Sequence, residues 1–215
     1  MSLIYTGQHV TSVPWDGDSL DDAARTELPG ADPYLDPRWN RNMTKIVMWG
    51  SRTFIWSAAT SLVSEFGMPG WIQPDWSPDG SMIVFHGFDD QKSAVMVADT
   101  LGTNVRVLVE GLDYLANPRW SPDGSRIAFV GRFGSGDLQV WTVQADGSGL
   151  SQITTHGAGE HLAWSPSGSE IVYVHYSYLD FTCVGGNFPN GTIWSVNPST
   201  GVHRQITTNA GLDCP

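Results

Sequence analysis

Pro118-Arg119-Trp120-Ser121-Pro122-Asp123-Gly124-Ser125 is the stretch of sequence that decides the fold, because the chain repeats it. The other copies, one complete and two partial, are Pro74-Asp75-Trp76-Ser77-Pro78-Asp79-Gly80-Ser81, Pro37-Arg38-Trp39 and Leu162-Ala163-Trp164-Ser165-Pro166-Ser167-Gly168-Ser169. A phrase that returns at a spacing of roughly 40 to 45 residues indicates an array of similar structural units.

Each copy predicts a strand that runs into a tight turn. Proline sets the first turn position, aspartate caps the turn with its side chain, and glycine takes the left-handed position that closes it. A second strand follows, beginning seven residues after each tryptophan, at Ile46, Ile83, Ile127 and Ile171. Third and fourth strands are predicted from Leu138–Val143 and Ser151–Thr155. Four strands per repeat are typical of a blade, so the sequence predicts an all-β fold, a β-propeller of four-stranded blades.

The blade count is about five, and the sequence leaves two ways to arrange them. Leu3–Gly7 matches the second strand of a blade whose inner strand is missing, and Pro215 aligns with Pro118 at the start of another. Either five blades close into a ring, with the C-terminal segment completing the first blade, or the chain is a slice of a larger propeller. Unclosed blade edges would favour a homo-oligomer. The whole of 1–215 is expected to be a single propeller domain, with these blade repeats: 1–36, 37–73, 74–117, 118–161 and 162–215.

Composition excludes several classes of function. The 22 acidic residues outnumber the 11 basic ones and give a net charge of −11, and no basic stripe is visible, so a nucleic-acid partner is not expected. No apolar run is long enough to span a membrane, and the start of the chain has no signal-peptide pattern. The sequence contains no nucleophile elbow, phosphate loop or zinc-protease motif. We therefore expect no cofactor and no metal, and favour a non-enzymatic protein.

The repeated phrase, the Ile-x-Phe strand after it and the Gln-Ile-Thr of the fourth strand together resemble the WD-like repeat of TolB and its relatives. The resemblance covers essentially the whole chain, although Asn40-Arg41-Asn42-Met43 replaces Ser-Pro-Asp-Gly in the first copy. It implies a TolB-like propeller and a periplasmic or extracellular location. It says less about function, because related propellers serve as binding proteins, as sensor domains and as parts of hydrolases and lyases.

Related propellers commonly bind ligands at the end of the channel where the inner strands begin. In this chain one polar residue per repeat stands at that point, immediately before the proline or its equivalent. These residues are Asp36, Gln73, Asn117, His161 and Cys214. One interpretation is a ring of ligand-contacting side chains around the channel mouth. The other is ordinary turn chemistry before proline, which explains Asp and Asn better than Gln, His and Cys.

The sequence predicts other features on the same face. Trp71 and Tyr114 stand in the loops that enter inner strands and would offer stacking surfaces for a ligand. An insertion between His175 and Ile193 is either a functional loop on this face or a lid over the channel mouth, which a disulfide between Cys183 and Cys214 would staple. The sequence thus favours a binding module for a protein segment or a small polar ligand such as a sugar. The alternative is an enzyme, a lyase or hydrolase, acting on carbohydrate or peptide at the same face.

Overall fold

The computed structural model describes residues 2–6, 9–13, 26–27, 35–67, 69–89, 91–155, 157–158, 161–175 and 192–207. These residues form strands and turns, with no helix among them, so the described part contains none that could cross a membrane.

The strands form five antiparallel sheets, one after another in chain order. The first sheet contains β1 (Ser2–Thr6), β2 (His9–Val13) and β3 (Thr26–Glu27). The second contains β4 (Leu35–Trp39), β5 (Lys45–Trp49), β6 (Thr53–Ser57) and β7 (Leu62–Phe66). The third contains β8 (Ile72–Trp76), β9 (Met82–Asp89), β10 (Lys92–Asp99) and β11 (Arg106–Leu112). The fourth contains β12 (Tyr114–Trp120), β13 (Arg126–Arg132), β14 (Gln139–Gln144) and β15 (Ser151–Gln152). The fifth contains β16 (Leu162–Trp164), β17 (Ile171–His175), β18 (Thr192–Val196) and β19 (His203–Gln205).

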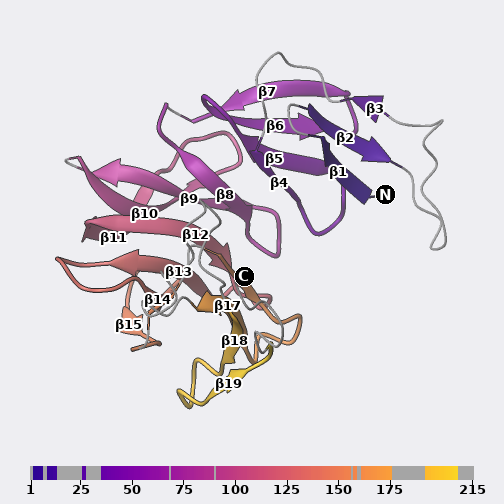
Figure 1. Cartoon of the computed structure of the whole chain (residues 1–215). Coiled ribbons are helices and arrows are strands. Elements are labelled where there is room, and N and C mark those ends of the chain that lie inside the picture. The colour runs from indigo at the N-terminus through magenta and orange to yellow at the C-terminus, as the bar shows by residue number, and fades with distance from the viewer. Residues whose placement is uncertain are drawn as a thin grey trace, which may run out of the picture.

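Each of the last four sheets is built from consecutive hairpins, and the sheets follow one another around an arc (Figure 1). This is the arrangement of propeller blades, and it confirms the predicted fold class. The division of the chain into blade repeats and the closure of the ring stay predictions.

The repeated phrase forms the hairpin between the first two strands of a blade. After β8, Ser77 Oγ donates to Asp79 Oδ1 at 2.6 Å and accepts the backbone N–H of Met82 at 2.9 Å. Gly80 takes a φ of 72°, a left-handed value that costs glycine little. The hairpin after β12 repeats this arrangement, because its sequence is the same.

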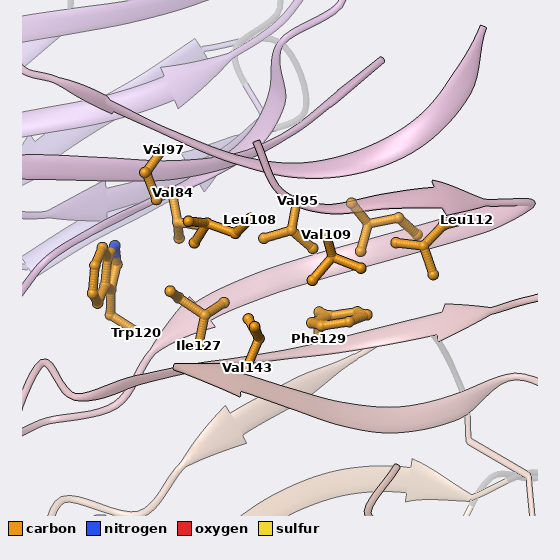
Figure 2. Close-up of a cluster of buried hydrophobic side chains, with 11 residues drawn as sticks. Val84, Val95, Val97, Leu108, Val109, Leu112, Trp120, Ile127, Phe129 and Val143 are labelled. Carbon is orange, nitrogen blue, oxygen red and sulfur yellow. The ribbon is translucent and has the colours of Figure 1, made fainter. Parts of the chain in front are cut away.

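Apolar side chains fill the space between neighbouring sheets. Figure 2 shows the cluster between the third and fourth sheets, where Val84, Val95 and Leu108 face Ile127, Phe129 and Val143. Val84, Val95, Ile127 and Phe129 are fully buried. A second cluster joins the second and third sheets, and another joins the fourth and fifth. These contacts hold the blades in fixed relative positions, which places the starts of their inner strands close together.

Candidate functional site

The inner strands β4, β8 and β12 each contain a bulge at the residue that precedes the proline. The pairing with the second strand slips between Leu35 and Arg38, between Ile72 and Asp75, and between Ala116 and Arg119. Within these bulges Asp36, Gln73 and Asn117 have φ values of 45°, 53° and 49°. Proline has no N–H to donate to the ladder, and a bulge re-aims the side chain beside it. In β16 leucine replaces the proline, and the pairing runs without a slip from Leu162 to Trp164.

A network of hydrogen bonds joins the starts of these strands, and its centre is Arg119. Arg119 Nη2 donates to Asp36 Oδ2 at 2.6 Å and to Asn117 Oδ1 at 2.6 Å. Arg119 Nη1 donates to the carbonyl oxygen of Gln73 at 3.4 Å. One guanidinium therefore connects the second, third and fourth sheets. Because the Arg119 side chain is only 5% exposed, these contacts are shielded from solvent.

Asn117 extends the network in two directions. Its backbone N–H donates to Gln73 Oε1 at 2.9 Å, and its Nδ2 lies 3.5 Å from His161 Nδ1. Asn117 is buried and His161 is exposed. The network thus begins in the interior and reaches the surface at His161.

Two further charged side chains stand at the position that follows the proline. Asp75 is half-buried and accepts the backbone N–H of Trp120 at 3.0 Å. Burial raises the pKa of Asp75, and the positive charges of Arg119 and Arg38 act in the opposite direction. Arg38 Nη2 also donates to Asp36 Oδ1 at 2.8 Å. Two guanidiniums and two carboxyl groups thus lie near one another along the inner strands.

The structure brings together four of the five residues that the sequence placed around one channel mouth, namely Asp36, Gln73, Asn117 and His161. The fifth, Cys214, lies outside the described residues, as does Cys183, so the expected disulfide and lid lie outside them too. Whether the four residues bind a ligand stays a prediction.

The two expected stacking residues pack against apolar clusters between the sheets. Trp71 is 8% exposed, and its ring stacks on Phe85 with centroids 4.1 Å apart. The indole packs in the cluster between the second and third sheets, where it buries a large apolar surface, instead of facing a ligand. Tyr114 is half-buried and packs against the cluster between the fourth and fifth sheets.

Sequence reasoning missed Arg119, although the repeated phrase contains it. The signal was the residue between proline and tryptophan, which is Arg38, Asp75 and Arg119 in successive copies. Charges of alternating sign at one repeat position of the inner strands indicate side chains that compensate one another across blades. No group of three or more His, Cys, Asp or Glu side chains in the described part is placed to hold a metal ion.

Comparisons with known proteins agree with this architecture. Residues 60–177, more than half of the chain, match the sequence profile of the TolB β-propeller domain. A TolB structure from Agrobacterium tumefaciens superposes with a TM-score of 0.76 at 20% identity, over 94% of this chain and 75% of that one. The TolB of Acinetobacter baumannii superposes with a TM-score of 0.70 at 19% identity, over 93% of this chain.

A curated relative is the oligogalacturonate lyase of Dickeya dadantii, which is 36% identical over 74 residues. That match covers 33% of this chain and 17% of the lyase. The chain covers 48% of the Acinetobacter protein, so it spans about half the length of that relative.

Proposed function

Because the chain belongs to the TolB β-propeller family, we propose that it is a binding module that recognises a protein segment or a small polar ligand. The contact surface is the end of the inner strands where Asp36, Gln73, Asn117 and His161 lie. The observation that carries the proposal is the Arg119 network, which fixes these four residues relative to one another across blades.

The network supports binding through preorganisation. A buried guanidinium that already holds Asp36 and Asn117 keeps their side chains in one geometry, so a ligand does not have to order them. His161 is exposed, and the Asp36 side chain is 30% exposed, so both are available at the surface. An imidazole and a carboxylate offer both donors and acceptors to an extended peptide or a sugar.

We further propose that the protein resides in the periplasm or outside the cell, in keeping with its TolB-like repeats. We also propose that the protein forms a homo-oligomer.

Binding arrays test the proposed function. Wild-type protein and a His161→Ala variant are applied to an array of random twelve-residue peptides and to a glycan array that includes oligogalacturonates. We expect specific ligands for the wild type and a loss of about tenfold in affinity for the variant, the value of a hydrogen bond to a polar ligand group. A His203→Ala variant, on the outer strand β19, is the matched control and should bind as the wild type does. Equal binding by all three proteins would mean that the polar residues only shape the turns and do not contact a ligand.

A second candidate function is carbohydrate lysis, and the identity of 36% over 74 residues with an oligogalacturonate lyase favours it. Incubation with oligogalacturonate, with and without divalent metal ions, tests it through the ultraviolet absorbance of an unsaturated product. Turnover that disappears in the Asp36→Ala, His161→Ala double variant would favour the enzyme over the binding module.

A further inference from the structure

The opposite ends of the same inner strands line an open cavity of about 390 Å³. Its lining comes from four successive sheets and their hairpins: Trp39, Arg41, Trp76, Ser77, Pro78, Pro122 and Pro166. Four blades contribute to one cavity only where their inner strands converge, so this cavity lies at the second mouth of the channel. About three residues of strand separate it from the Arg119 network, or roughly 10 Å.

The first hairpin departs from the repeated phrase yet keeps its geometry. Asn40 Oδ1 accepts the backbone N–H groups of Thr44 and Lys45, both at 2.9 Å, as Ser77 Oγ accepts that of Met82. Met43 has a φ of 55° where the third sheet has Gly80 at 72°. As a result, Arg41 occupies the turn position that proline holds in the other three copies, at Pro78, Pro122 and Pro166.

This substitution places one positive charge in an otherwise uncharged cavity. Arg41 is the charged member of the lining, and its side chain has no hydrogen-bond or ion-pair partner among the described residues. By contrast, Arg38, Arg119 and Arg204 all pair with carboxylates. Asp79 and Arg41 both line a neighbouring pocket, but the carboxylate oxygens of Asp79 accept hydrogen bonds from Ser77 and Ser81. The Arg41 guanidinium is therefore free to meet an anion.

Apart from Ser77, the remaining lining consists of tryptophan and proline side chains. Trp39 is half-buried, and Trp76 is fixed because its Nε1 donates to the carbonyl oxygen of Arg38 at 3.0 Å. Proline rings and indoles favour the flat or apolar face of a ligand, and cavities of this size hold small molecules. The chain's net charge of −11 repels a bare anion at long range, so contact with the rings must supply part of the affinity.

We propose that this cavity is a second binding site, for a small carboxylate whose ring lies against Trp39 while its carboxylate meets Arg41. The site goes beyond the function proposed for the Arg119 network, because it lies at the other mouth of the channel and uses none of the same side chains.

Titration of the full chain with two pairs of probes tests the site: benzoate against benzyl alcohol, and glucuronate against glucose. Binding is measured by calorimetry and by the indole N–H signals in NMR spectra. We expect at least one carboxylate to bind and its neutral counterpart to bind about tenfold more weakly or not at all. Inorganic phosphate, which lacks a ring, should bind more weakly than the carboxylate.

Two substitutions of Arg41 keep the test decisive. Arg41→Pro restores the residue of the other copies, and Arg41→Gln removes the charge without proline; both should weaken carboxylate binding about tenfold. Lys45→Gln, which removes a neighbouring cation outside this cavity, should change nothing, and His161→Ala should change nothing either. The proposal is overturned if no carboxylate binds, if the neutral probes bind equally well, or if both Arg41 variants bind as the wild type does. None of these results would affect the site at the other mouth.

Discussion

A single guanidinium, that of Arg119, joins three blades at the start of their inner strands. Replacing it by methionine keeps much of its volume but leaves the carboxylates of Asp36 and Asp75 without their buried partner. Removal of one member of a buried ion pair costs about 3 to 5 kcal/mol, so Arg119→Met should lower the free energy of unfolding by about 3 kcal/mol. Arg38→Met, whose side chain is 38% exposed, should cost less than about 1 kcal/mol. Urea denaturation measures both, and equal losses would contradict the central position of Arg119.

His86 makes folding sensitive to mild acid. It stands in β9 at the register position where β13 and β17 carry Val130 and Val174, and it is 7% exposed, with Nε2 3.1 Å from Ser93 Oγ. Burial lowers the pKa of His86 from 6.5 to about 4. The unfolded chain therefore takes up a proton at a higher pH than the folded chain does.

The stability that neutral His86 contributes is present above pH 6.5 and is lost as the pH falls toward 4. The loss amounts to about 3 kcal/mol at pH 4. His86→Phe should remove that part of the pH dependence, whatever its effect at pH 7. Urea denaturation from pH 7 to 4 measures the slope, and an unchanged slope in the variant would assign the acid sensitivity to other groups.

For individual residues, the sequence predicts where the candidate site lies better than it predicts the hydrogen bonds within the site. Alignment on the prolines finds Asp36, Gln73, Asn117 and His161, because equivalent places in successive blades surround one axis. It cannot find the bonds of Arg119, which depend on the approach of three separate strands. Sequence reasoning also misplaced Trp71: it was expected to face a ligand, but a neighbouring sheet covers this loop tryptophan and makes it a core residue.

In the fourth sheet, the tryptophan at the end of the inner strand β12 is more deeply buried than the tryptophan of the third strand, β14. Trp120 is 9% exposed and packs with the cluster between the third and fourth sheets, whereas Trp141 is half-buried at the edge of that cluster. Trp120→Ala should cost about 3 to 5 kcal/mol, the range for removal of a large buried aromatic side chain, and Trp141→Ala should cost less. Equilibrium denaturation compares the two, and equal small losses would contradict the register assigned to the blades.

Strand order and hairpin turns could be predicted because the signals are local: Pro-Asp-Gly makes a turn and alternating apolar residues make a strand. The bulges in β4, β8 and β12 could not, since they depend on how the residue before proline meets the second strand. In the described part of β16, where Leu162 replaces proline, the pairing runs from Leu162 to Trp164 without a slip.

In the whole molecule, one face of the fifth sheet is less buried than the corresponding faces of the third and fourth sheets. Val95 and Val140 are fully buried at a position where β18 has Ile193, which is 39% exposed. The sheet before it covers its other face, where Ile171 and Tyr173 are buried. An apolar face that packs a further blade in the preceding sheets favours a second copy of the chain here.

We expect the protein to self-associate through this face and the Ile193→Lys variant to shift it toward the monomer. Light scattering after gel filtration, across a range of concentrations, measures the mass of both proteins. A wild type that remains monomeric at every concentration would contradict the homo-oligomer.

We propose that this propeller meets its ligand at the polar ends of the inner strands. The most direct measurement is backbone hydrogen exchange of the wild-type chain with and without the tightest-binding peptide or glycan from the arrays. We predict that binding slows exchange at the starts of β4, β8, β12 and β16, around Asp36, Gln73, Asn117 and His161, and leaves the outer strands β7 and β11 unchanged. Protection confined to the outer strands, or to the hairpins at the other mouth of the channel, would contradict the claim.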